Sequence, residues 1–390
     1  MTERIWKTTK SLVVLPVFIL SVCTYSCVER FWPEVTRYDN LLVVDGLLTN
    51  GNDPVIVKLA TSSPINENVL NPLSGGELHI TDENLTETPF IETEPGTYQV
   101  MDSSFRGKIG SDYKLHIYLA DGRNYESDIC HLSPPSPIDS VYGVIESFDI
   151  QNSIRRLWGM QFYINNHSVT GDTCYYQWRL SQTYKYKSSL NIDYTWEGEF
   201  IPYPKPDSLR TCWKSEQINQ IYTYSTAHID PPVIKQFPLI FVTTKTRELS
   251  IRYSLLVKQL SISGDAFNFW DALRQQNIEQ GNLYSQQPIQ IIGNIHNVND
   301  LGEAILGYFT VAGITEQRIY VNRPAVIPYY YSICDPYKDV VLDIMWISPE
   351  FWPVYITDDP DTGLAGGAHK ACFDCRLRGG TITQPDFWVN

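Results

Sequence analysis

Short runs in which apolar and polar residues alternate recur along the first third of the chain, and this pattern most constrains its fold. Residues 113–119 read Y-K-L-H-I-Y-L. Residues 41–51 and 54–60 are two further β-rich runs, and the Asn50-Gly51 pair that closes the first of them predicts a hairpin. Short alternating runs with a turn signal about every ten residues are typical of a β-sandwich.

One segment departs from the strand pattern and predicts a helix. Phe267, Trp270 and Leu273 recur at helical spacing. Asp265 stands where an N-cap residue is expected, and Gly281 stands where a glycine ends many helices. We therefore expect one main helix in the second half of the chain.

The whole pattern predicts a mainly β protein with two domains, because a chain of 390 residues is too long for one ordinary domain. Residues 40–136 are expected to form an immunoglobulin-like or transthyretin-like β-sandwich. Residues 137–390 are expected to form a larger β-rich domain, with the helix near 265–280 and a cysteine-containing C-terminal region. Within it, the polar and aromatic stretch 181–232 is expected to form loops and irregular hairpins.

The N-terminus has the layout of a bacterial lipoprotein signal. A basic start is followed by an apolar run over residues 12–22 and by T-Y-S-C, in which Ser26 precedes Cys27. Residues 1–26 are therefore predicted to be a signal peptide, Cys27 the lipidated residue, and 27–39 a tether. Cys23 is the rival cleavage position, and an ordinary secretory signal or short signal anchor is the alternative.

The charge of the chain excludes one class of partner. The formal net charge is −14, and without the basic signal segment it is about −16. A nucleic-acid-binding protein needs a basic footprint, which this composition does not offer. We expect no nucleic acid partner and a body held to the outer membrane by its N-terminal lipid.

Six of the eight cysteines remain once Cys23 leaves with the signal peptide and Cys27 carries the lipid, and an even number in an exported chain favours disulfides. Two pairings are proposed, Cys174 with Cys212 and Cys334 with either Cys372 or Cys375. The C-x-x-C formed by the last two, with His369 nearby, admits a metal site as the weaker alternative because a second ligand pair is missing.

No short sequence motif indicates a catalytic site. Neither H-E-x-x-H nor G-x-S-x-G occurs, and the acidic run Asp358, Asp359 and Asp361 lacks the glutamate that ends an EF-hand loop. The Gly379-Gly380 pair precedes a non-helical sequence, so it predicts a tight turn instead of a phosphate site. We expect no enzyme, no cofactor and no metal.

The chain is rich in aromatic residues, with 25 tyrosines and 10 tryptophans. A cluster of them forms the candidate contact surface, with packing in the core as the alternative. Its members are Tyr184, Tyr186, Tyr194, Trp196, Phe200 and Tyr203.

Several short motifs occur in a fixed order along the chain. They are V-E-R-F-W-P-E (Val28–Glu34), L-V-V-D-G-L-L-T (Leu42–Thr49), P-G-T-Y (Pro95–Tyr98), D-G-R-N-Y-E-S (Asp121–Ser127), I-D-S-V (Ile138–Val141), D-A-F-N-F-W (Asp265–Trp270), G-N-I (Gly293–Ile295), L-G-Y-F (Leu306–Phe309) and C-F-D-C-R-L-R-G-G-T-I-T-Q-P-D-F-W (Cys372–Trp388). With these motifs the chain resembles the Bacteroidetes lipoproteins grouped as domain of unknown function 4249 (DUF4249).

The resemblance implies an exported outer-membrane lipoprotein, often encoded near TonB-dependent receptors, and no established catalytic activity. We therefore expect a non-catalytic accessory or ligand-binding partner of a TonB-dependent receptor in nutrient uptake. An accessory subunit of an outer-membrane assembly or secretion complex is the first alternative. A carbohydrate-active or peptide-cleaving enzyme is the second.

Overall fold

The structure is a computed structural model that describes most of the chain. The described residues are 41–63, 70–149, 156–168, 172–279, 291–334, 344, 346–358 and 363–389. The chain divides into two compact units, and the described residues other than Ser63 belong to the larger one, which comprises 41–62 and 69–390. The predicted signal peptide, Cys27 and the tether lie outside the described residues.

The fold is mainly β, as predicted, and α2 (Gly264–Glu279) is the main helix expected near 265–280. The first strands are β1 (Leu42–Thr49), β2 (Ile56–Thr61), β3 (Asn71–Pro72), β4 (Glu77–Asp82), β5 (Glu87–Glu94), β6 (Thr97–Val100), β7 (Asp112–Tyr118), β8 (Asn124–Ser127) and β9 (Cys130–His131). β1 and β2 form the predicted hairpin. Apolar side chains of β1, β2, β4, β7 and β8 meet in one core.

The later strands fall into three groups. Their bounds are β10 (Ile138–Asp149), β11 (Arg156–His167), β12 (Tyr175–Lys187), β13 (Tyr194–Trp196), β14 (Phe200–Pro202), β15 (Thr211–Ser225), β16 (Val233–Thr243), β17 (Arg252–Ile262), β18 (Ile295–Asn297), β19 (Leu306–Asn322), β20 (Val354–Asp358) and β21 (Ala365–Gly367). β10, β11 and β16 form a small sheet, and β14, β13, β20 and β21 form another. β15, β12, β17 and β19 continue into the sheet that contains β1.

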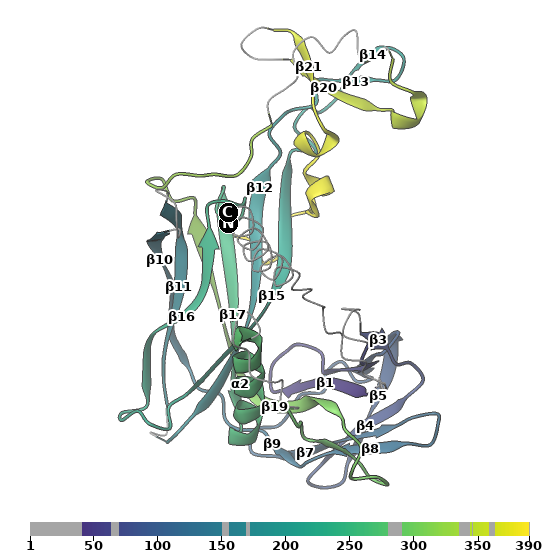
Figure 1. The fold of residues 1–390 in the computed structure, drawn as a ribbon, viewed down its shortest axis with the longest axis vertical. Helices are drawn as coiled ribbons and strands as arrows, with labels where there is room; N and C mark the ends of the chain where they lie inside the picture. Colours follow the sequence, from purple (N-terminus) through teal and green to yellow (C-terminus); the bar gives the residue numbers. More distant parts are fainter. Residues whose placement is uncertain are drawn as a thin grey trace, which may run out of the picture. The chain divides into compact units, whose positions relative to one another are not determined.

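β19 joins the first strands to the later ones. Its first half pairs in parallel with β1, and its second half pairs antiparallel with β17. Figure 1 shows β1 beside β19, with α2 close by. Phe309 and Val311 of β19 therefore lie in the same core as the N-terminal strands.

Two glycines of the ordered motifs allow close backbone contacts at the start of β19. Gly307 has a φ of +100°, and a Cβ built on it would lie 1.8 Å from the carbonyl oxygen of Val44. A Cβ on Gly293 would lie 1.7 Å from the carbonyl oxygen of Gly307. The neighbouring Asn294 amide binds both the backbone N–H of Phe309 (2.9 Å) and its carbonyl oxygen (3.0 Å). These motif residues therefore have a structural role.

One local prediction holds only in part, and one is wrong. The stretch 181–232 contains irregular segments and the β13–β14 hairpin, as expected, but also the end of β12 and the 15-residue strand β15, whose polar side chains cover the exposed face of a sheet edge. The helix cap is Ser263 instead of Asp265, since the Ser263 hydroxyl accepts a hydrogen bond from the Ala266 N–H at 3.2 Å. Gly281 lies outside the described residues.

No helix in the described part of the chain combines the length and the apolar character that a membrane crossing requires.

Candidate functional site

The C-terminal cysteines form two disulfides, which supports the disulfide interpretation of the C-x-x-C sequence. Cys334 is bonded to Cys372, one of the two partners left open by the sequence, and Cys375 is bonded to Cys212. The predicted pairing of Cys174 with Cys212 is wrong, because Cys212 on β15 faces the C-terminal segment. No cluster of His, Cys, Asp and Glu that could hold a metal ion occurs within the described ranges.

Cys174 and Cys130 are free thiols. Cys174 precedes β12, and its sulfur lies 3.3 Å from the Ser168 hydroxyl. Cys130 accepts a hydrogen bond from the Asn294 amide at 3.2 Å, and burial raises the pKa of its thiol to about 12. A thiol with such a pKa stays protonated and is a poor nucleophile, so Cys130 is a packing residue.

The six candidate aromatic residues do not form one surface. Tyr184 and Tyr186 are buried in the core under β12 and are excluded as contact residues. Tyr194, Trp196 and Tyr203 are partly buried, and Phe200 is exposed. Phe200 packs edge-on against Trp196 with ring centroids 5.0 Å apart, so of the six candidates one exposed ring remains, with a partly buried tryptophan beside it.

The acidic run and the glycine pair also have defined places. Asp358 ends β20, whereas Asp359 and Asp361 lie outside the described residues. Gly379 has a φ of +82° and ends the short 3₁₀ helix η3 (Cys375–Arg378), so the predicted tight turn is confirmed.

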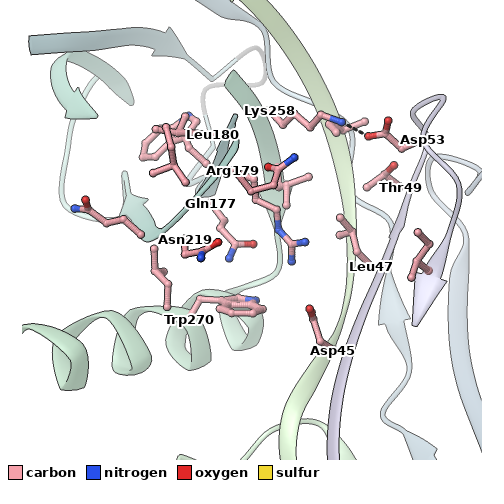
Figure 2. Close-up of a pocket in the computed structure, with 18 of the residues that line it drawn as sticks. Asp45, Leu47, Thr49, Asp53, Gln177, Arg179, Leu180, Asn219, Lys258 and Trp270 are labelled. Carbon is pink, nitrogen blue, oxygen red and sulfur yellow. Dashed lines mark hydrogen bonds and ion pairs between the residues drawn. The ribbon is translucent and has the colours of Figure 1, made fainter. Parts of the chain in front are cut away.

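A hollow of about 640 Å³ lies where β1 and β2 face β12, β15, β17 and α2. Ligand sites commonly have volumes of about 300–1,000 Å³, so this hollow can hold a small organic molecule. Figure 2 shows the strand residues Gln177 and Arg179 facing Leu47 across it, with Trp270 of α2 along one side. These side chains come from distant parts of the chain.

Arg179 is the most unusual group in the hollow. It is partly buried, and among the described residues no carboxylate lies within ion-pair distance of its guanidinium. Its guanidinium carbon lies 5.8 Å from the centroid of the Trp270 ring. Burial lowers the pKa of Arg179, and the charge of Asp45 partly opposes this effect. A desolvated guanidinium without a counter-ion is costly unless a ligand compensates it.

The neighbouring cation, Lys258, is already paired with carboxylates. Lys258 on β17 is the cross-strand partner of Arg179. Its ammonium forms an ion pair with Asp53, drawn in Figure 2, and another with Glu316 at 3.3 Å. Lys258 therefore has two carboxylate partners while Arg179 faces the hollow.

The indole of Trp270 and the helix that carries it are held in place. The Trp270 indole N–H donates a hydrogen bond to the Thr310 hydroxyl at 3.2 Å. Asp271 of α2 accepts a hydrogen bond from the Thr223 hydroxyl of β15 (2.9 Å), which fastens α2 to β15, and another from Arg274 of the same helix (2.8 Å). The helix wall of the hollow is therefore tied to β15 and β19.

Sequence reasoning did not find this hollow. Trp270 was noticed as part of the apolar stripe of the helix, but Arg179 and Lys258 belong to strands whose pairing no local pattern states. One local signal could have indicated Arg179. It is a basic residue among the buried positions of the strand segment 175–180.

The described region is thus a disulfide-linked β protein with a ligand-sized hollow. A family model described as "Domain of unknown function (DUF4249)" matches residues 28–318, and the chain belongs to this family. A search of curated proteins found no match.

Proposed function

We propose that this chain is a non-catalytic, lipid-anchored outer-membrane protein of a Bacteroidetes bacterium, which binds a ligand as the partner of a TonB-dependent receptor in nutrient uptake. The hollow beside Arg179 carries this proposal. It offers a cation, amides and an indole face in a space of about 640 Å³, which are the features of a small-molecule site.

The cellular location is supported by two independent features. The sequence before Cys27 has the layout of a lipoprotein signal. The two disulfides fit an oxidising compartment outside the cytoplasm, because cytoplasmic thiols are kept reduced. In this proposal the lipid on Cys27 holds the protein at the membrane.

A pull-down of the tagged protein from mild detergent, followed by mass spectrometry, tests the partnership. We expect a TonB-dependent barrel in nearly equal amount. A Cys27→Ser variant is the matched control, because it keeps the folded body but loses the lipid, and it should recover much less barrel.

Other results would contradict the proposal. Assembly or secretion factors in place of a transporter would assign the protein to that machinery. Turnover of a glycan or peptide that one Asp or Glu substitution abolishes would make it an enzyme.

A further inference from the structure

We propose that the hollow binds the carboxylate of a small organic anion, with Arg179 pairing the carboxylate and Trp270 packing against the body of the ligand. This inference names the ligand class for the binding role proposed above and rests on that role. It is argued from the position of Arg179, the charges around it and the chemistry of the walls.

Arg179 is placed to receive an anion. Gln177 and Arg179 are two residues apart on β12, so their side chains point to the same face of the sheet. Figure 2 shows both directed into the hollow. The planar guanidinium offers a fork of N–H donors that matches a carboxylate in two parallel hydrogen bonds.

The local arrangement of charge also favours an anion. Arg179 and Lys258 are directly opposite each other on neighbouring strands, although like charges at such positions are unfavourable. The two acidic partners of Lys258 offset its own charge, but in the described part of the chain no ion pair offsets that of Arg179. An anion placed on Arg179 would relieve this repulsion.

The number of charges favours a carboxylate over a phosphate. The charged side chains that line the hollow are Lys58, Arg179, Lys258, Asp45 and Asp53, which sum to one positive charge. Asp45 is the cross-strand partner of Lys58, so a carboxylate lies beside this second cation. Glu316, the second partner of Lys258, offsets this surplus, so the cation that remains for a ligand is the guanidinium of Arg179. One guanidinium matches a singly charged carboxylate better than a phosphate group, which carries close to two negative charges.

The walls indicate an amphipathic ligand body. The Trp270 ring and Leu47 offer apolar surface, and the amides of Gln177 and Asn219 offer hydrogen bonds. An acidic sugar and the C-terminal residues of a short peptide share this combination of carboxylate, polar groups and an apolar face. The experiment below distinguishes these two sources.

Calorimetric titration of the purified full chain tests the inference with two matched pairs of probes. The first pair is digalacturonate and the neutral disaccharide of galactose. The second is the tripeptide Gly-Gly-Phe with a free C-terminus and its C-terminal amide. We expect one acidic probe to bind and its neutral counterpart to bind at least tenfold more weakly.

Three substitutions assign the binding to this hollow. Arg179→Gln should weaken binding of the acidic probe at least tenfold. Arg179→Lys should weaken this binding less, because the positive charge remains. Asp45→Asn should tighten binding severalfold, since it removes the nearby negative charge. Arg156→Gln is the matched control on an exposed strand end, and it should leave affinity unchanged.

Asp45 is exposed, so its substitution stays informative even if Arg179→Gln does not fold. Equal binding of acidic and neutral probes, or unchanged affinity in Asp45→Asn and in a folded Arg179→Gln, would overturn the carboxylate inference. If none of the four probes binds, the carboxylate inference is also overturned, but co-purification of the barrel would still support the receptor partnership. Loss of the barrel alone would instead refute the receptor partnership.

Discussion

At the scale of single residues, Gln259 shows how the interior of the protein is fixed. Its side chain is fully buried and makes hydrogen bonds at both ends of the amide. The oxygen accepts from Asn166 (2.7 Å) and from the Trp178 indole (2.9 Å), and the nitrogen donates to the Ser136 carbonyl (3.0 Å). One amide thus connects β11, β12, β17 and the segment before β10.

Replacing Gln259 by leucine should destabilise the fold by about 2–4 kcal/mol, because two buried donors lose their partner and the Ser136 carbonyl keeps only the hydrogen bond from Thr315. Urea unfolding followed by tryptophan fluorescence measures this change in the free energy of unfolding. Gln276→Leu on α2 is the matched control and should change stability by less than about 0.5 kcal/mol. Equal effects of the two substitutions would show that the Gln259 network contributes nothing specific.

At this scale the sequence was informative about strands and uninformative about the site. The alternation of Tyr113–Leu119 predicts buried and exposed faces without knowledge of any partner strand. The position of Arg179 opposite Lys258 depends on the register between β12 and β17, which is a non-local property. The same reasoning explains why Tyr184 and Tyr186 were candidates for a surface but lie in the core.

At the scale of elements, the parallel contact between β1 and β19 depends on Gly307. Gly307→Ala should destabilise the protein by more than about 3 kcal/mol, since the left-handed φ and the clash with Val44 are both unfavourable. Gly264→Ala is the control, because a Cβ there meets only ordinary contacts at 3.5 Å or more. Thermal unfolding of both variants provides the comparison, and similar midpoints would contradict the proposed role of Gly307.

The docking of α2 should depend on pH through Asp271. Burial alone raises the pKa of Asp271, but hydrogen bonds from Arg274, Thr223 and Gln275 outweigh it and leave the pKa below its usual value. A carboxyl whose pKa is depressed in the folded state stabilises the protein above its unfolded pKa of about 4. This stability is lost as the pH falls through the folded pKa.

Asp271→Asn should therefore cost about 1 kcal/mol at pH 7, and the cost should shrink as the pH falls below about 4. Unfolding by urea across this range measures the difference between the variant and the parent chain. Asn268→Ser, at an exposed position of the same helix, is the control, and any cost that it has should not change with pH because neither side chain titrates. A cost that stays constant with pH would contradict the role of the ionised carboxylate.

The helix itself was predictable, whereas its contacts were not. The helical spacing of Phe267, Trp270 and Leu273 predicts one apolar helix face, and all three residues lie within α2. The predicted N-cap was Asp265, whereas the observed N-cap is Ser263. Both residues can act as caps, and the backbone conformation determines which side chain accepts a hydrogen bond from the first turn.

At the scale of the whole molecule, the Cys212–Cys375 disulfide joins residues 163 positions apart and binds the C-terminal segment to β15. The segment is also held by packing, since Phe373 is fully buried and Trp213 forms a β-bridge with Thr381. The double substitution Cys212→Ala and Cys375→Ala should therefore cost about 2–5 kcal/mol without unfolding the N-terminal strands.

Limited proteolysis with mass spectrometry should locate the effect. Cleavage is expected first within 363–389 in the double variant, and in the parent chain only after a reducing agent is added. Cys130→Ala removes a free thiol and is the control. A reducing agent should change the cleavage pattern of this variant as it changes that of the parent chain. If reductant changes neither the cleavage pattern nor the midpoint of the parent chain, packing alone holds the C-terminal segment, and the disulfide has no stabilising role in this molecule.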